Sequence, residues 1–382
     1  MQRAEIAKAA SEGLKEFSKT IGSVKTTVGF DGFVDSIIDV VKTRQDADNY
    51  QPVPTIKEYG ERIVAAAGES ANIELVTKLR KLGGNGPIMA NALASYGLPV
   101  TYIGNLGHPN LDEVFLPFAE IANILSIADP GYTDALEFED GKLMMGKHSS
   151  LKDVNADTLN EVLGKGKFQQ IIGDTAFLGM VNWTMLTKLN SIWDLLIDEI
   201  LPAVASNVNG KKRMIFVDLA DPAKRTREDI ADALGRLTKM SKLADVVLGL
   251  NLAESTQIAK VLGIEVQADA EAEIEFTAQR IREKLDIKAV VIHPRSCAAA
   301  AVQGENSVES GRFQGPFVKK PKLSTGAGDN FNAGFCLGLL AGLPVTQAVC
   351  TGTAASGFYV RNARSATLAE MIDFCADMPP AE

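Results

Sequence analysis

The chain has 382 residues, of which 46% are hydrophobic and 23% charged, the balance of an ordinary globular protein. This length suits one large α/β unit with a small excursion. The net charge of −9 gives no basic footprint, so we expect neither nucleic acid nor an anionic membrane as a partner.

The amino terminus and the cysteines predict a cytoplasmic protein. Residues 1–6 contain no signal-peptide hydrophobic region. The longest apolar run, 333–345, includes Pro344 and is too short to span a membrane. Four cysteines form no Cys-x-x-Cys pair, which favours free core thiols over a metal site. Three histidines without His-x-x-x-His spacing offer little for zinc.

Hydrophobic periodicity predicts a mostly parallel α/β protein. The expected elements in chain order are an amphipathic helix over 2–19, a strand over 25–30, a polar segment over 42–70, a strand or helix over 72–79, a small-residue helix from 89, a strand over 100–106, a helix and strand over 115–127, a hairpin with an Asp-Gly turn over 133–147, strands at 168–172, 214–218, 245–250 and 289–293, and helices over 331–343 and 349–359. We expect 1–41, 61–128 and 154–382 to form the core, and 42–60 with 129–153 to form a small β lid.

A glycine-rich turn near the carboxyl terminus carries the clearest chemical signal. Gly326, Ala327 and Gly328 have almost no side chain, so their N–H groups can close on an anion at the start of the helix that follows. Asp329 comes next, where a carboxylate could take a proton from an attacking hydroxyl. An anion hole beside a base suggests phosphoryl transfer to an alcohol. The alternative is an ordinary turn followed by an acidic residue that favours a helix N-terminus.

Two other phosphate-binding patterns are not supported. The chain contains no Gly-x-x-x-x-Gly-Lys-Ser/Thr, which excludes a P-loop. None of its Gly-x-Gly pairs continues to a third small residue at the offset that a dinucleotide fingerprint requires.

Three motifs resemble the ribokinase-like (PfkB) carbohydrate kinases. Residues 325–334 resemble the family's Gly-Ala-Gly-Asp signature, 83–97 its amino-terminal glycine-rich signature, and 251–254 its Asn-x-x-Glu. The resemblance runs from about residue 28 to 365. It implies a three-layer α/β/α fold with a β lid, and ATP with Mg²⁺ as cosubstrates. A homodimer through the lid is an option that the sequence leaves open.

The acceptor side is expected at the end of the first strand and at the first glycine-rich turn. By resemblance, Asp35 contacts substrate hydroxyls, and Asp31 is a second candidate that could instead satisfy local N–H groups as a turn residue. Gly83 and Gly84 let the backbone approach a ligand. The family's usual Asn is Ile88 here, so Asn85 is the candidate replacement for hydroxyl recognition, ahead of the helix-face residue Asn91.

The nucleotide side is expected near Asn251 and Glu254. Glu254 could hold a hydrated Mg²⁺, although the same pair also fits a simple helix capping box. The resemblance adds Thr325 and Thr353 as nucleotide contacts.

Two departures from the family bear on the phosphoryl donor and on cations. The loop 292–297 replaces the family's Thr-x-Gly-x-x-Gly, which leaves ATP as the donor open and makes His293 and Arg295 candidate substitutes. Leu323 replaces an Asp that helps relatives bind a monovalent cation, so activation by K⁺ is not expected.

These features leave three hypotheses. The first is an ATP- and Mg²⁺-dependent kinase of a sugar or sugar derivative, with Asp329 as base. The second is a nucleoside kinase, supported by a stretch at 218–222 that faintly resembles adenosine-kinase-like relatives and by Phe30, Phe33 and Phe177 as stacking candidates. The third is a non-catalytic ligand-binding relative, which the altered 292–297 loop and Leu323 support and the intact Gly-Ala-Gly-Asp at 326–329 opposes.

Overall fold

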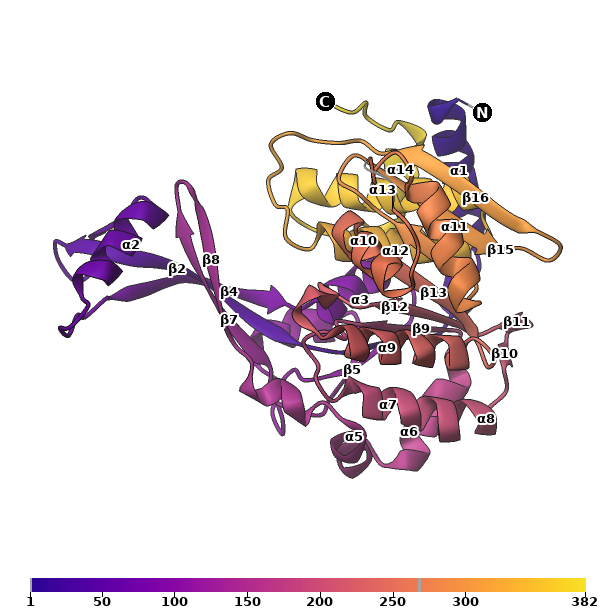
Figure 1. Ribbon diagram of the computed structural model, residues 1–382, viewed down its shortest axis with the longest axis horizontal. Helices are drawn as coiled ribbons and strands as arrows, with labels where there is room; N and C mark the ends of the chain where they lie inside the picture. Colours follow the sequence, from indigo (N-terminus) through magenta and orange to yellow (C-terminus); the bar gives the residue numbers. More distant parts are fainter. Residues whose placement is uncertain (1, 267–268) are drawn as a thin grey trace.

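The structure is a computed structural model that describes residues 2–266 and 269–382. Its body is built on a nine-stranded sheet in the order β16-β15-β14-β13-β12-β9-β1-β5-β6 (Figure 1). All neighbouring strands from β14 to β6 run parallel, and β15 and β16 add an antiparallel hairpin at one edge. The strands are β1 (Thr26–Phe30), β5 (Val100–Gly104), β6 (Asn123–Ser126), β9 (Phe177–Val181), β12 (Met214–Asp218), β13 (Asp245–Leu250), β14 (Ala289–Ile292), β15 (Cys297–Gln303) and β16 (Val308–Gln314).

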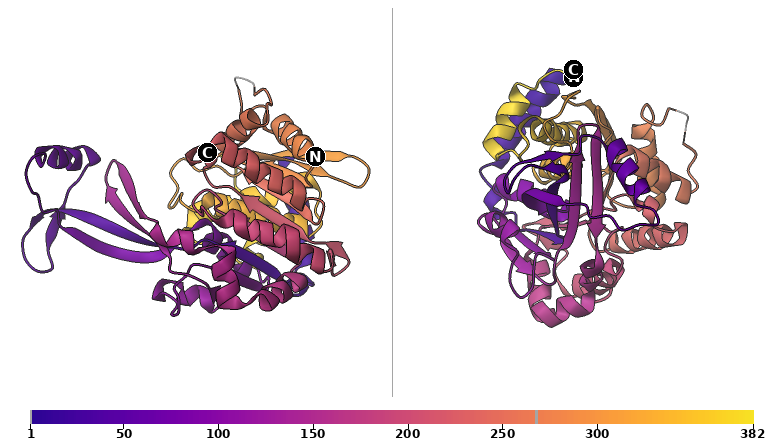
Figure 2. Two further views of the ribbon diagram at one scale, coloured as in Figure 1. Left: turned by 60° about the horizontal axis from the view of Figure 1, so that its bottom comes forward. Right: turned by 90° about the vertical axis from the view of Figure 1, so that its left-hand side faces the viewer.

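Helices cover both faces of this sheet because its central strands are apolar on both sides. In β12, Ile215 and Val217 pack into one hydrophobic cluster, and Phe216 between them packs into the cluster on the opposite face. Such two-sided burial is the usual environment of parallel strands. The expected three-layer α/β/α fold is therefore confirmed, and Figure 2 shows the helical layers on either side of the sheet.

The two layers are formed by helices from different parts of the chain. One face carries α5 (Ala156–Leu163), α6 (Lys165–Asp174), α7 (Leu189–Leu195), α8 (Leu201–Ala203), α9 (Arg227–Met240), α10 (Leu252–Val261) and α11 (Ile274–Leu285). The other carries α1 (Arg3–Phe17), α3 (Asn85–Ser95), α4 (Leu116–Ala119), α12 (Ala327–Leu340), α13 (Val345–Asn362) and α14 (Leu368–Ala376). The expected amino-terminal helix is thus confirmed as α1, while Met1 lies outside the described residues.

An arm of β-structure extends away from the body (Figures 1 and 2). It contains β2 (Phe33–Arg44), β3 (Tyr50–Pro52), β4 (Leu75–Gly83), β7 (Gly131–Phe138) and β8 (Gly141–Lys147), with α2 (Ile56–Ala65) at its far end. A small apolar cluster of its own, which includes Ile38, Val40 and Tyr59, holds this end of the arm together.

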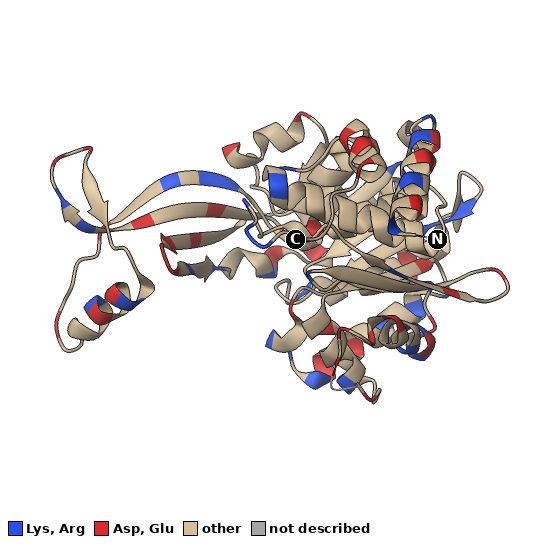
Figure 3. Cartoon of the chain, turned by 90° about the horizontal axis from the view of Figure 1, so that it is seen from above, with Lys and Arg blue, Asp and Glu red and all other residues tan. Residues whose placement is uncertain are grey.

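The arm is larger than the lid expected over 42–60 and 129–153. Its longest strand, β2, begins at Phe33, and β4 pairs with it over 75–83, so segments that the sequence assigned to the core belong to the arm's sheet. The sequence left 72–79 open as a strand or a helix, because most side chains of β4 are exposed or half-exposed and show no clear apolar period. Figure 3 shows basic and acidic residues interspersed along the arm and the body.

Two sequence-based expectations were wrong in detail. Residues 168–172 are helical, within α6, because Phe168 and Ile172 are one helix turn apart and both face the core. The strand lies just beyond, as β9. In the expected hairpin, Phe138 pairs with Gly141, so the turn is Glu139-Asp140 instead of Asp-Gly.

Expectations for the other elements of the body are confirmed. The remaining strands and the two carboxyl-terminal helices lie where the periodicity placed them. All four cysteines are buried and free. Within 2–266 and 269–382, the structure contains no helix with the length and hydrophobicity that crossing a bilayer requires.

Candidate active site

The candidate site lies where the carboxyl ends of the parallel strands meet the first turns of α3 and α12. Open α/β sheets bind ligands at this edge, because the loops that follow the strands are free to carry polar groups. Here those loops contribute Asp31 after β1, Asn182 after β9 and Asn251 after β13, while β12 ends in Asp218.

Gly326 starts α12 in a conformation that suits glycine. Its φ is +92°, and a Cβ at this position would lie 2.8 Å from the hydroxyl oxygen of Tyr359. That hydroxyl donates to the carbonyl of Thr325 over 2.9 Å, which fixes the turn just before the helix. The N–H of Ala327, one of the three expected at 326–328, instead donates to the carbonyl of Ser324 over 3.2 Å. The N–H groups of Gly328 and Asp329, in the first turn of α12, lie at the positive end of the helix dipole, where an anion can bind.

Asp329 is held in this first turn and is only 7% exposed. Its Oδ1 accepts a hydrogen bond of 2.9 Å from Nδ2 of Asn85 in α3. Burial raises the pKa of Asp329 to about 7, the Asn85 hydrogen bond opposes that rise, and the negative charges of Asp31 and Glu254 add to it. A carboxylate with a pKa near neutrality suits general-base chemistry.

The turn at 83–86 connects Asp329 with the expected acceptor side. Gly83 lies against Asp35: a Cβ built on Gly83 would be 2.5 Å from that carboxyl group, which leaves room for glycine alone. Asp35 lies on β2 beside Thr133 of β7, is 8% exposed, and has its pKa raised by burial. Of the expected residues, Asn85 thus contacts Asp329 directly, and Gly83, two residues before Asn85, lies against Asp35.

Asp31 occupies a different environment from Asp35, since it is completely buried. Its Oδ1 accepts from the backbone N–H of Gly86 over 2.8 Å, and its Oδ2 accepts from the backbone N–H of Asn85 over 3.0 Å. The side chain of Asn182 donates a third bond of 2.8 Å. Burial raises the pKa of Asp31 to about 6 despite these bonds. This environment favours the local turn role over direct substrate contact.

Asn251 and Glu254 form a complete capping box at the start of α10. Oδ1 of Asn251 accepts from the N–H of Glu254 over 3.0 Å, and Oε2 of Glu254 accepts from the N–H of Asn251 over 2.8 Å. Oε1 of Glu254 also accepts from the N–H of Asp221 over 2.8 Å. The capping role that the sequence allowed is therefore present, and it holds Glu254 at the strand edge.

Asp218 adds a second buried carboxylate beside Glu254. Its Oδ2 accepts a 2.7 Å bond from Nδ2 of Asn332 in α12. Burial, with the nearby charges of Glu254 and Asp329, holds the pKa of Asp218 well above its usual range. Among residues 2–266 and 269–382, no group of three or more His, Cys, Asp or Glu side chains is arranged to hold a metal directly. Two adjacent carboxylates instead fit Mg²⁺ held largely through water and phosphate oxygens.

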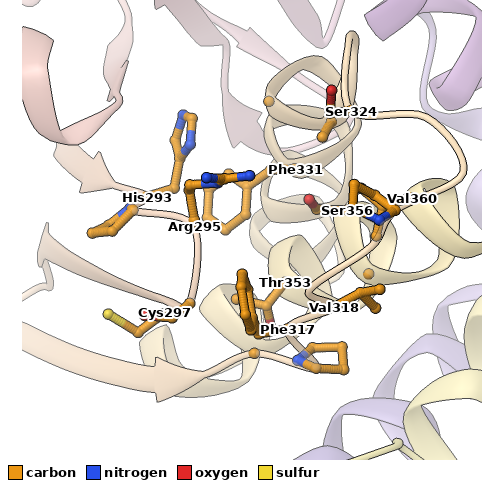
Figure 4. A pocket seen from close by; sticks show the side chains of 18 of the residues that line it. His293, Arg295, Cys297, Phe317, Val318, Ser324, Phe331, Thr353, Ser356 and Val360 are labelled. Carbon is orange, nitrogen blue, oxygen red and sulfur yellow. The ribbon is translucent and has the colours of Figure 1, made fainter. Parts of the chain in front are cut away.

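A cavity of about 320 Å³ opens beside the first turn of α12 (Figure 4). Its lining includes the expected residues Asn251, Ala327, Gly328 and Thr353, whereas Thr325 is not part of it. His293 also lines the cavity, and its ring stacks on Phe331 with centroids 4.5 Å apart.

The altered 292–297 loop forms one wall of this cavity. Arg295 and Cys297 both contribute to that wall (Figure 4). Burial lowers the pKa of His293 to about 4, so its imidazole is neutral near pH 7.

The aromatic residues suggested for nucleoside stacking are placed less favourably. Phe177 begins β9 at the opposite end of the sheet from Asp329 and is fully buried, and Phe30 is also fully buried in the core. Phe33 packs against His148 at the base of the arm.

The comparisons with known proteins identify the family of the chain. The family described as prokaryotic ketohexokinase matches residues 3–378. The chain belongs to the prokaryotic ketohexokinase family. It is 25% identical to a protein from Haloferax volcanii named ketohexokinase, an alignment that covers 97% of this chain and 95% of that one. The expectation of a ribokinase-like carbohydrate kinase is confirmed.

Solved structures share the fold at low sequence identity. A phosphofructokinase-2 mutant from Escherichia coli has a TM-score of 0.62 at 16% identity, with 93% of this chain and 98% of that chain covered. Arabidopsis thaliana ribokinase, crystallised with ribose and ATP, has a TM-score of 0.58 at 14% identity, with 92% and 98% covered.

Besides Asp218, named only as part of the 218–222 stretch, sequence reasoning missed three residues that shape the site. Asn182 was missed because its strand was placed at 168–172 instead of 177–181. Asn332, one helix turn beyond Asp329, was read only as part of an apolar helix. The contact between Tyr359 and Thr325 joins residues 34 positions apart in the sequence, so no local pattern predicts it.

Proposed function

We propose that this protein transfers the γ-phosphoryl group of ATP to a hydroxyl group of a sugar. The acceptor oxygen bonds to the γ-phosphorus, the bond from that phosphorus to the β,γ-bridging oxygen breaks, and ADP leaves. Asp329 takes the hydroxyl proton. The observation that carries this proposal is the position of Asp329 in the first turn of α12: it directly follows Gly328, which lines the 320 Å³ cavity, and it accepts a hydrogen bond from Asn85 of the turn that also contains Gly83.

The residues around Asp329 have separate roles in the proposed phosphoryl transfer. The N–H groups of Gly328 and Asp329 stabilise negative charge on the transferring group. Asp35 and the 83–84 backbone orient the acceptor, and the cavity lined by Asn251 and Thr353 takes the nucleotide. Since the transition state of phosphoryl transfer is loose, positioning contributes more than the strength of the base.

Asp218 and Glu254 are the residues that we propose for the Mg²⁺ side of the site. When bound, Mg²⁺ neutralises charge that develops on phosphate oxygens. The two carboxyl groups lie buried together at the edge of β12 and β13, which raises both of their pKa values, and a hydrated cation beside them would favour their ionised forms.

We propose a ketohexose as the first acceptor to test, because the family and the Haloferax volcanii relative carry that name. A nucleoside acceptor is less favoured, since Phe30 and Phe177 are buried in the core away from any ligand surface. A purely ligand-binding role leaves the raised pKa and central position of Asp329 without a use.

The arm remains a proposed lid and a proposed dimer contact. It carries exposed apolar side chains, including Leu79 (55% exposed), Met144 and Met145 (both 52%). Closure of a lid would exclude water, which competes with the acceptor for the phosphoryl group.

The test is formation of ADP from ATP and Mg²⁺ across fructose, other ketohexoses, aldohexoses, ribose and adenosine, with Asp329→Ala measured beside the wild type. The proposal predicts sugar-dependent ADP release that the variant loses. Release that depends only on adenosine would favour the nucleoside alternative. Tight ATP binding without any turnover would favour a binding protein.

A further inference from the structure

The fully buried carboxylate of Asp31 ties three separate elements together. It follows β1 and accepts hydrogen bonds from the first residues of α3 and from the residue that follows β9. Ionised carboxylates that accept several such bonds are well fixed, because each donor restricts the plane of the group. Asp31 itself has no surface that a substrate could reach.

The local backbone is shaped to fit this carboxylate. Gly84 has a φ of +94°, and a Cβ there would lie 3.0 Å from Oδ2 of Asp31. A Cβ on Gly86 would lie only 2.5 Å from Oδ1. Side chains at these positions would therefore push the turn off Asp31.

Asn85 links Asp31 to the candidate base. Its backbone N–H donates to Oδ2 of Asp31 over 3.0 Å, and its side-chain Nδ2 donates to Oδ1 of Asp329 over 2.9 Å. The position of the Asn85 amide thus depends on a backbone that Asp31 holds.

Asn182 completes the arrangement from the opposite side. Its φ is +62°, a region that residues other than glycine seldom adopt, and it is 3% exposed. Its Nδ2 donates to Asp31, while its Oδ1 has no hydrogen-bond partner in the described parts of the chain. Backbone strain and a buried unpaired oxygen both cost stability, and such costs concentrate at functional sites.

We propose that Asn182 and Asp31 are positioning residues for phosphoryl transfer. Asn182 fixes the carboxylate of Asp31, Asp31 fixes the backbone of residues 85 and 86, and the Asn85 amide then orients Asp329. This inference rests on the proposed function, and neither Asn182 nor Asp31 contacts the acceptor or the nucleotide in it.

The test uses Asn182→Gly, because glycine tolerates the positive φ while removing the amide. We expect kcat to fall about 10- to 100-fold, the scale of a small misplacement at a reacting centre, with the KM for ATP changed by less than about twofold. The matched control is Asn209→Gly, at another positive φ (+53°) in the distant β10–β11 hairpin (Asn207–Val208 and Lys211–Lys212), which should leave kcat unchanged.

A double-variant cycle separates positioning from general stability. If Asn182 acts through Asn85, the kcat of the double variant Asn182→Gly/Asn85→Ala should lie within about twofold of the kcat of Asn85→Ala alone. Additive losses would overturn the proposal, as would a folded Asn182→Gly protein with wild-type kcat. A merely structural role would lower the melting temperature and leave kcat per folded molecule unchanged.

A second variant covers the case in which Asn182→Gly does not fold. Asp31→Asn keeps the side-chain volume and one acceptor oxygen, and it is judged by the same cycle with Asn85→Ala. Wild-type protein without sugar kinase activity would reject the proposed function itself. Active wild type with uncoupled variants would reject only the positioning network.

Discussion

The hydrogen bond from Asn85 to Asp329 should control the pH at which the protein becomes active. It stabilises the ionised carboxylate, and hydrogen bonds to charged groups contribute about 1.5–3 kcal/mol. Since one pKa unit corresponds to about 1.4 kcal/mol, Asn85→Ala should raise the pKa of Asp329 by about 1–2 units. The variant keeps the backbone N–H that Asp31 accepts, so the turn itself is retained.

The assay is kcat/KM for the sugar at saturating ATP and Mg²⁺, from about pH 5.5 to 9.5, because its acid limb reports the essential base. Wild type should lose activity below about pH 7, where Asp329 becomes protonated. In Asn85→Ala the limb should move to about pH 8–9, with much of the loss recovered in alkali. Asn91→Ala, on the same helix, is the control. An unmoved limb, or an equal loss at every pH, would refute the reasoning and favour direct recognition of substrate by Asn85.

Three further substitutions test the acceptor and metal sides. Asp35→Asn should lower kcat/KM for the sugar about 10- to 100-fold with little change for ATP, whereas Asp39→Asn, farther along β2, should not. Gly83→Ala places a Cβ 2.5 Å from Asp35 and should weaken sugar binding at least about tenfold, while Gly60→Ala, in open space on α2, should be neutral. Glu254→Gln should raise the Mg²⁺ concentration for half-maximal rate about tenfold, and a lower melting temperature with unchanged Mg²⁺ dependence would leave only the capping role.

Much of the fold could be predicted from the sequence because buried parallel strands are continuous apolar runs, which are easy to recognise. The runs that became β12, β13 and β14 are apolar at nearly every position, which is what burial on two faces requires. The arm could not be predicted to the same extent. The residues of β4 are mostly exposed and include two lysines and an arginine, so its place in the arm depends on pairing with β2, which no local pattern reveals.

The candidate site likewise contains residues that a local sequence pattern predicts and residues whose role depends on contacts between distant segments. Asp329 and Gly326 were found because their chemistry is local, in one turn at the start of one helix. The environment of Asp31 was not, since its donors come from α3 and from the end of β9, far along the chain. Asp31 and Asp35 differ in sequence position by only four residues, yet only the structure shows that Asp31 is enclosed while Asp35 lies beside Gly83.

Asp329→Asn, measured for activity and stability in one preparation, tests the central claim most directly. Because burial raises the pKa of Asp329 to about 7, ionisation makes the folded protein less stable as pH rises from about 4 through 7. The neutral variant escapes that loss, which is up to about 4 kcal/mol. We therefore predict that kcat falls about 10²–10⁴-fold while stability at pH 8 is maintained or increased. A folded variant that phosphorylates sugar at close to the wild-type rate would contradict the assignment of Asp329 as the base.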